Sequence, residues 1–145
     1  MIYRLPVVIE AGRTTVAVNA GGAIVPAAVA TYLICHDHLR LSALFATLVV
    51  TALTFAVARA VPGVGIVTPA LLPPLAAAVA AILIGGHAVP AVAYVAGTLG
   101  TLIGADVLNL PRIRSLQAPV VSIGGAGTFD GVFLTGLVAI LLASL

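Results

Sequence analysis

The sequence predicts an all-α fold, a polytopic transmembrane helical bundle of about five spans, and three observations lead to this prediction. Of the 145 residues, 62% are hydrophobic and only 7% are charged, whereas a soluble domain has about 25% charged residues. The mean hydropathy is +1.29. Several apolar stretches approach the roughly 20 residues that an α-helix needs to cross the hydrocarbon core. We therefore expect a single transmembrane domain over residues 1–145 and exclude a soluble globular fold.

The spans follow in order along the chain. Residues 1–15 lack the apolar core and the small-residue cleavage site of a signal peptide, so we expect an interfacial N-terminal segment there. The five spans are expected at about 16–34, 42–61, 69–86, 88–108 and 126–145. The charge of +2 says nothing about nucleic acid, and we expect membrane lipid as the surrounding partner. Because five short spans enclose a small core, we also expect a homo-oligomer.

One or two of these helices are expected to be interrupted or re-entrant. Val18–Pro26, "VNAGGAIVP", has the composition of the broken helices that line ion and substrate sites in transporters, and a proline kink with close packing is the alternative. Val61–Leu75, "VPGVGIVTPALLPPL", predicts a hinge-like or re-entrant loop before the short third span. That span either crosses at a tilt or dips into the bilayer and returns.

Arginine residues predict the orientation, because cytoplasmic loops carry an excess of them. If the chain crosses five times, one side receives Arg4, Arg13, Arg59, Arg112 and Arg114. The other side receives Arg40 alone. We therefore expect a multi-pass protein of the cell membrane, with its N-terminus in the cytoplasm and its C-terminus outside.

Two aspartates lie inside apolar segments at a similar predicted depth. Asp106 lies about one turn before the end of the fourth span, and Asp130 about one turn after the start of the fifth. Because these helices are antiparallel neighbours, the two carboxyl groups can meet. A charge inside a membrane is expensive and usually functional, and two carboxyl groups in one dry site cannot both ionise. This predicts an acid–base pair or a proton-binding site, unless both groups are interfacial and pair with Arg112 or Arg114.

Small and polar residues surround this pair in the sequence. Glycine faces let helix backbones approach closely, and bare backbone near an acid can present N–H groups to it. We expect the site to be lined by Asn19, Gly21, Gly22, Gly104, Asn109, Gly124, Gly125, Gly127, Thr128 and Gly131.

Motifs for metal and nucleotide sites are missing from the sequence. There is no HExxH, phosphate-binding loop or GxSxG segment. The adjacent residues His36, Asp37 and His38 would rarely present metal ligands in one direction. We expect neither a metal nor a cofactor.

Four segments resemble a known family: "VNAGGAIVP", "GVGIVTPALLPPLAA", "GTLGTLIGADVLNL" and "SIGGAGTFDGVFLTGLVAILLA". They are similar to the bacterial and archaeal membrane family described as domain of unknown function 1614. The resemblance extends from about Val18 to Leu145 and supports the spans. It implies no activity.

A shorter resemblance bears on function. "GTFDGVFLTGLVAILL" is similar to the G-x-G-D segment of presenilins and signal peptide peptidases, and "GADVL" to the Tyr-Asp segment of their preceding helix. It implies that Asp106 and Asp130 are catalytic and activate a water molecule to cleave a peptide bond within the bilayer. Phe129 and Ala105 depart from that pattern, since they replace a glycine and the tyrosine.

Those enzymes also have a Pro-Ala-Leu tripeptide, which here matches Pro69, Ala70 and Leu71. The resemblance makes these residues candidates for a substrate-contacting loop, although they precede both acids instead of following them.

Three classes of function stay open on the sequence. We favour an intramembrane aspartyl peptidase that cleaves transmembrane peptides. The alternatives are a small transporter or channel that uses the same aspartates to couple to a proton or cation, and a non-catalytic assembly protein in which the glycine faces pack subunits.

Overall fold

The computed structural model describes residues 14–115, 119–125 and 131–145. Within them the chain is mostly helical. The α-helices are α1 (Val25–His36), α2 (Arg40–Val57), α3 (Leu72–Ile84), α4 (Val89–Thr101) and α5 (Gly131–Ala143). Two π-helical turns, η1 (Ala20–Ile24) and η3 (Leu102–Val107), lead into α1 and continue α4. Two short 3-10 helices are η2 (Gly86–Ala88) and η4 (Leu110–Ser115).

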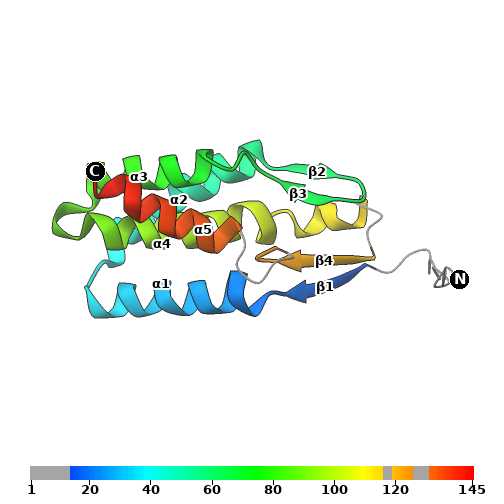
Figure 1. Ribbon diagram of the computed structural model, residues 1–145, viewed down its shortest axis with the longest axis horizontal. Coiled ribbons are helices and arrows are strands. Elements are labelled where there is room, and N and C mark those ends of the chain that lie inside the picture. Colours follow the sequence, from blue (N-terminus) through cyan, green and yellow to red (C-terminus); the bar gives the residue numbers. More distant parts are fainter. Residues whose placement is uncertain (1–13, 116–118, 126–130) are drawn as a thin grey trace, which may run out of the picture.

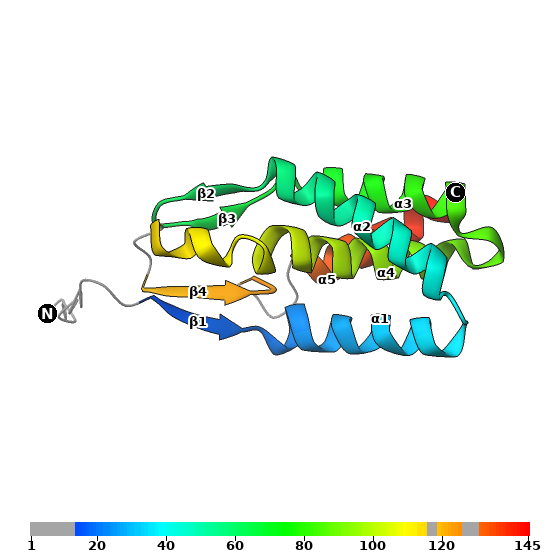
Figure 2. The ribbon, with the colours of Figure 1, turned by 180° about the vertical axis from the view of Figure 1, so that it is seen from behind.

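Helix α4 lies at the centre of the bundle and contacts α1, α2, α3 and α5. The helices run roughly along the long axis of the molecule, and the strands gather at one end (Figure 1). The turns from α1 to α2 and from α3 to α4 lie at the other end with the C-terminus, as the view from behind also shows (Figure 2). We call the end with the strands the strand end and the opposite end the turn end.

Four short strands add two small sheets to the predicted helices. The strands are β1 (Thr15–Val18), β2 (Arg59–Val61), β3 (Gly65–Val67) and β4 (Val120–Ile123). Strand β1 pairs in parallel with β4, with Thr15 opposite Val120 and Val18 opposite Ile123. Strands β2 and β3 form an antiparallel hairpin.

These strands correct the expected boundaries of two helices. Residues 16–18 and 59–61, which we expected inside the first and second spans, are extended instead. The β-branched residues of Thr15–Val18, "TVAV", favour a strand. The expected hinge-like loop at Val61–Leu75 includes the turn and second strand of the hairpin, and Gly63 and Gly65 take positive φ angles of 76° and 124° there.

The interior of the bundle is built from small residues. The alanines with at most 1% of their surface exposed are Ala30, Ala43, Ala46, Ala77, Ala81, Ala93, Ala96 and Ala139. Large aliphatic side chains point outward instead, with Leu83 76% exposed, Leu41 71% and Leu141 66%. A soluble protein rarely exposes apolar surface of this extent. Small residues at helix contacts are instead typical of helices packed within lipid.

Glycines bring α4 close to its neighbours. A Cβ atom added at Gly104 would lie 2.6 Å from the backbone oxygen of Thr51 and 2.9 Å from Cβ of Thr54, both on α2. One added at Gly97 would lie 3.2 Å from Cβ of Ala139 on α5. The α2 backbone therefore nearly touches η3, the continuation of α4, at Gly104. The contact of α5 with α4 at Gly97 leaves slightly more room.

Two helical stretches are long and apolar enough to cross a membrane, Arg40–Val57 and Gly86–Arg112. Three other apolar helices, Ala20–His36, Leu72–Ile84 and Val132–Ala143, are shorter. A helix thus lies in each of the five expected ranges, while the number of membrane crossings stays a prediction.

Replacing Gly104 by alanine should lower the free energy of unfolding by about 1–3 kcal/mol, because the added methyl group meets backbone that cannot rotate away. Gly97→Ala is the matched control on the same helix. Its smaller clash should be largely offset by the roughly 1 kcal/mol that alanine gains over glycine in a helix. Denaturant titration in detergent micelles measures the free energy of unfolding of both variants. Equal stabilities for the two variants would contradict the close contact of α2 with α4.

Candidate functional site

A cavity of about 750 Å³ lies among elements of the strand end. Its walls come from β3, the start of α3, the end of α4 with η3, β4 and α5. The lining side chains with polar groups are Thr68, Thr101, Asp106, Ser122 and Thr135. Asp106 is the one charged residue among the described lining residues. We call this space the Asp106 cavity.

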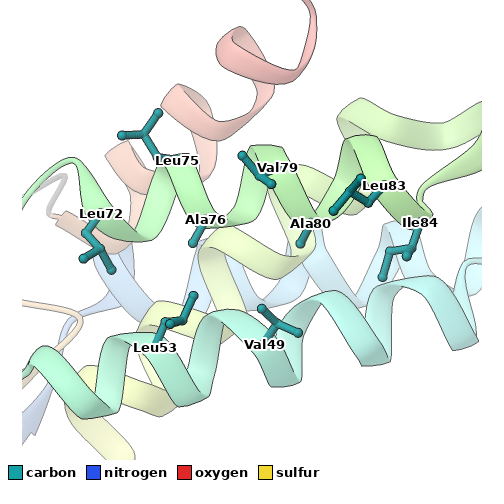
Figure 3. Close-up of a pocket in the computed structure, with 9 residues that line it drawn as sticks. All are labelled: Val49, Leu53, Leu72, Leu75, Ala76, Val79, Ala80, Leu83 and Ile84. Carbon is teal, nitrogen blue, oxygen red and sulfur yellow. The ribbon is translucent and has the colours of Figure 1, made fainter.

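A second cavity, of about 590 Å³, is a groove between α2 and α3 (Figure 3). It is lined by Val49, Leu53, Leu72, Leu75, Ala76, Val79, Ala80, Leu83 and Ile84. All of these side chains are aliphatic, so the groove holds no side chain that can transfer a proton or act as a nucleophile. Of these two cavities, it is therefore the Asp106 cavity that holds groups for such chemistry.

The π-helical turn η3 places Asp106 at the cavity wall. Its wide turn is closed by the bond from the Leu108 amide to the Ile103 oxygen, 2.9 Å long, and such turns are frequent at functional sites. Asn109 then ends the helix: its Nδ2 donates to the oxygens of Gly104 and Ala105, both at 2.9 Å. The helix can therefore stop soon after Asp106 without leaving these two carbonyl groups unsatisfied.

Arg112 supports this helix end from outside. Its Nη1 donates to Oδ1 of Asn109 at 3.0 Å, and its guanidinium group lies 5.2 Å from the ring centre of Phe55 on α2. Such a cation–π contact is favourable. Arg112 thus orients the Asn109 amide and ties the end of α4 to α2.

Asp106 accepts a hydrogen bond from backbone beside β4. The Gly124 amide donates to Oδ2 of Asp106 at 2.7 Å, which is the short distance typical of a charge-assisted bond. Gly124 and Gly125 both have φ of 79°, a conformation that a side chain would strain. The two glycines are therefore needed for the backbone to turn its N–H toward the carboxylate.

Asn19 connects the Gly124–Gly125 turn to the start of η1 through hydrogen bonds from both ends of its side-chain amide. Its Oδ1 accepts from the amides of Gly21 and Gly22 at 3.0 and 3.2 Å, which caps η1. Its Nδ2 donates to the Gly125 oxygen at 3.0 Å. A Cβ atom at Gly22 would collide with the Gly124 oxygen. We call Asn19, Gly22, Gly124 and Gly125 the glycine clasp.

The structure brings several of the predicted site residues together. Asp106, Gly125, Ala70 and Leu71 line the cavity. The Gly124 amide donates a hydrogen bond to Asp106, and Asn19 caps Gly21 and Gly22. Pro69 lies in the chain between two lining residues, Thr68 and Ala70.

Two other predicted lining residues lie elsewhere. Gly104 faces α2, and Asn109 is fully buried and bonded to helix carbonyl groups. Both support the element that carries Asp106, but neither is among the residues around the cavity.

The second predicted catalytic residue, Asp130, lies outside the described residues, as do Gly127 and Thr128. Gly131 begins α5. Gly125, which directly precedes residues 126–130, and Val132 in the first turn of α5 both line the Asp106 cavity.

The His36–His38 segment lies at the turn end, away from the cavity. The His36 ring stacks on Tyr32, with 5.2 Å between ring centres. In the part of the chain that the structure describes, no group of three or more His, Cys, Asp and Glu side chains could hold a metal ion.

The sequence analysis did not predict that two strands, β3 and β4, contribute to the cavity. A signal was present: "VVSI" is rich in β-branched residues, and "AVPGVGIV" places a Pro-Gly turn between two apolar runs. Both strands lie outside the expected spans, in segments that we expected to be loops between helices.

One family model matches almost the whole chain. It is described as "Protein of unknown function (DUF1614)" and matches residues 1–142. No curated protein and no solved structure matches the chain.

Asn19 variants should separate the two functions of this side chain. Asn19→Ala loses the cap and the bond to Gly125, and should lower the free energy of unfolding by about 1–2 kcal/mol. Asn19→Asp keeps the acceptors but not the donor. Amide hydrogen exchange should therefore accelerate at Gly124 and Gly125 in both variants, but at Gly21 and Gly22 only in the alanine variant.

Thr31→Ala is the control for this comparison, because it removes an exposed bond to Ala27 farther along α1. It should leave exchange at all four glycines unchanged. Unchanged exchange at Gly124 and Gly125 in Asn19→Asp would show that the amide does not hold the clasp.

Proposed function

We propose that this chain, which belongs to the DUF1614 family of proteins of unknown function, is an integral membrane protein whose five helices cross the bilayer. The outward-facing leucines and the alanine-rich interior support this proposal. So does the placement of charge: Arg59 in β2 and Arg112 in η4 lie at the strand end, and Arg40 begins α2 at the turn end (Figure 1). By the positive-inside rule, the strand end is cytoplasmic.

Helix lengths explain why a cavity forms at the strand end. The stretch Gly86–Arg112 has 27 residues, or about 40 Å of helix at 1.5 Å per residue. Helices α3 and α5 have 13 residues each, or about 20 Å. They leave the last turns of the longer helix uncovered, and the Asp106 cavity lies there. This arrangement would admit water to a group that is otherwise within the bilayer.

We propose further that Asp106 and Asp130 are the acid–base pair of an intramembrane aspartyl peptidase that cleaves transmembrane peptides. The observation that carries this proposal is that Asp106 shares its cavity with Gly125 and Val132, which lie on either side of Asp130 in the sequence. Asp130 is two residues from Val132, so their Cα atoms are at most about 7 Å apart. This distance lets a carboxyl group at position 130 reach the same space.

The chemistry uses the two carboxyl groups in opposite protonation states. One carboxylate takes a proton from a water molecule while the water oxygen attacks the carbonyl carbon of the substrate. The other carboxyl group donates its proton to the carbonyl oxygen, which gives a neutral tetrahedral intermediate. The carboxyl group that took the proton from water then transfers it to the amide nitrogen, while the other carboxylate takes a proton from a hydroxyl group of the intermediate. The carbon–nitrogen bond breaks to give an amine and a carboxylic acid, and both enzyme groups return to their starting states.

A cleavable peptide must be extended at the bond that is cut. In a helix its carbonyl groups are hydrogen-bonded and shielded by side chains. Strands β3 and β4 line the cavity, and each belongs to a two-stranded sheet among the described residues. Their free edges can hydrogen-bond an unwound stretch of substrate. Ala70 and Leu71 line the same space and would contact the side chains of that stretch.

A proton- or cation-coupled transporter is the second candidate. It is favoured by hydroxyl groups in the same cavity as the acid, since Thr101 and Thr135 line the cavity with Asp106 and oxygen ligands suit both protons and hard cations.

We also propose a homo-oligomer, for which the exposed apolar helix faces provide surface. In an assembly protein without chemistry, substitution of the acids would affect stability alone.

Asp106→Asn and Asp130→Asn should each reduce cleavage of a transmembrane peptide in liposomes by about 10²–10⁴-fold, because each removes one partner in proton transfer. Asp37→Asn is the matched control, since Asp37 is exposed at the turn end and its replacement should leave cleavage unchanged. Proton and cation flux are measured in the same liposomes.

Two other outcomes would each support a different function. Flux in the wild type, lost in both variants and without any cleavage, would replace the peptidase by a transporter. Neither cleavage nor flux in the wild type, with only lowered stability in the variants, would leave the assembly role.

A further inference from the structure

Four buried hydroxyl groups have no hydrogen-bond partner among the described residues: those of Thr51, Thr54, Thr98 and Thr101. A threonine or serine in a helix usually donates to the carbonyl four residues before it. Thr31 and Ser144 do so here, each at 2.8 Å. Leaving a buried hydroxyl group unsatisfied is unfavourable. The four threonines therefore require a partner other than the helix backbone, or bear that cost.

Thr101 differs from the other three because it alone among them lines the Asp106 cavity. Thr101 is only 5% exposed, and its hydroxyl group is buried within the wall of the cavity. Thr54 is fully buried and faces Gly104 in the contact of α2 with α4. Thr98, one turn deeper on α4, is also fully buried and lies against Gly136 of α5 beside the Tyr94 ring.

The surroundings of Thr101 meet the requirements for bound water. A buried water molecule needs room and two to four polar partners. The cavity volume of about 750 Å³ provides the room. Asp106, Thr135 and Thr101 itself line the same space and supply polar groups. The chain thus has an unpartnered, buried donor on a residue that lines the same cavity as the carboxylate to which we assign the chemistry.

We propose that Thr101 holds water in the Asp106 cavity, and that this water is the source of the molecule that Asp106 activates. The second half of this proposal rests on the proposed peptidase function, because hydrolysis consumes one water molecule for each bond cut. The first half does not depend on it. Thr101 acts on the substrate only through water, so it is a positioning residue and not a catalytic one.

Water at Thr101 can be detected without any activity. Cys35 is exposed and is first replaced by serine. Thr101→Cys and Thr98→Cys are then introduced separately, and both are treated with the cationic thiol reagent methanethiosulfonate ethylammonium in liposomes. Because the thiolate that reacts forms only where water reaches, Thr101→Cys should react about tenfold or more faster than Thr98→Cys.

This comparison is decisive in either direction, because the two positions are on the same helix, one turn apart, and both are buried. A Thr101→Cys variant that does not react would overturn the proposal. Equal rates at the two positions would do so as well, since they would point to general opening of the bundle. Thermal unfolding of both variants shows that the labelled protein is folded.

The effect on catalysis is tested with Thr101→Val and Thr101→Ser. Thr101→Val keeps the shape but removes the hydroxyl group, and should lower kcat about tenfold with little change in KM, since the substrate itself is not contacted. Thr101→Ser should restore kcat. A rise in KM alone, or no rescue by serine, would contradict the positioning role. If Thr101→Cys reacts but the wild type cleaves nothing, the water site stands and the peptidase proposal fails.

Discussion

The 2.7 Å hydrogen bond from the Gly124 amide to Asp106 connects the parts of the structure on which any chemistry depends. It joins the end of the central helix to the backbone beside β4, and through the Asn19 amide it also reaches the start of α1. A carboxylate that is partly removed from water needs such donors. Only a residue without a side chain can present its amide there, because the φ angle is positive and the Gly22 backbone lies directly behind. The glycine clasp therefore donates a hydrogen bond to the acid through Gly124 and contributes to the wall of its cavity through Gly125.

Helix length and helix packing act together to produce this cavity. Alanines and glycines let the five helices pack closely along most of α4, which leaves little internal space. Helices α3 and α5 do not extend along the whole of the central helix, which continues through the π-helical turn η3 in contact with α2. The wide turn and the Asn109 amide then end the helix close to Asp106. The acid is placed where a tightly packed region meets an open one, and this is a suitable position for a group that must exchange protons with water.

The proposals for function share this one location. A peptidase, a transporter and a water-holding site all require a carboxyl group that is shielded from lipid yet reachable by water. They differ in what else enters the cavity. The strand edges of β3 and β4 and the residues Ala70 and Leu71 favour an extended peptide, because a proton or a cation would need no apolar contacts. The groove between α2 and α3 has no polar side chain and takes no part in this choice.

The sequence by itself determined that the chain is mostly helical and gave the approximate position of the five α-helices. These follow from composition and from local patterns, which can be recognised without knowing what lies opposite. The candidate status of Asp106 came from the same patterns and stays a prediction. The sequence also indicated that glycines near the acid matter, although it assigned Gly104 and Asn109 to the site when they support it from behind.

Only the tertiary structure decided how distant segments meet. Asn19 and Gly125 are 106 positions apart, and β1 and β4 pair across nearly the whole chain. Short strands at the ends of apolar helices have no periodicity long enough to identify them, and their pairing depends on where the bundle brings their edges. Whether a threonine faces lipid, a neighbouring helix or a cavity likewise depends on the helix opposite it, which is why Thr101 and Thr98 are alike in sequence but differ in their surroundings.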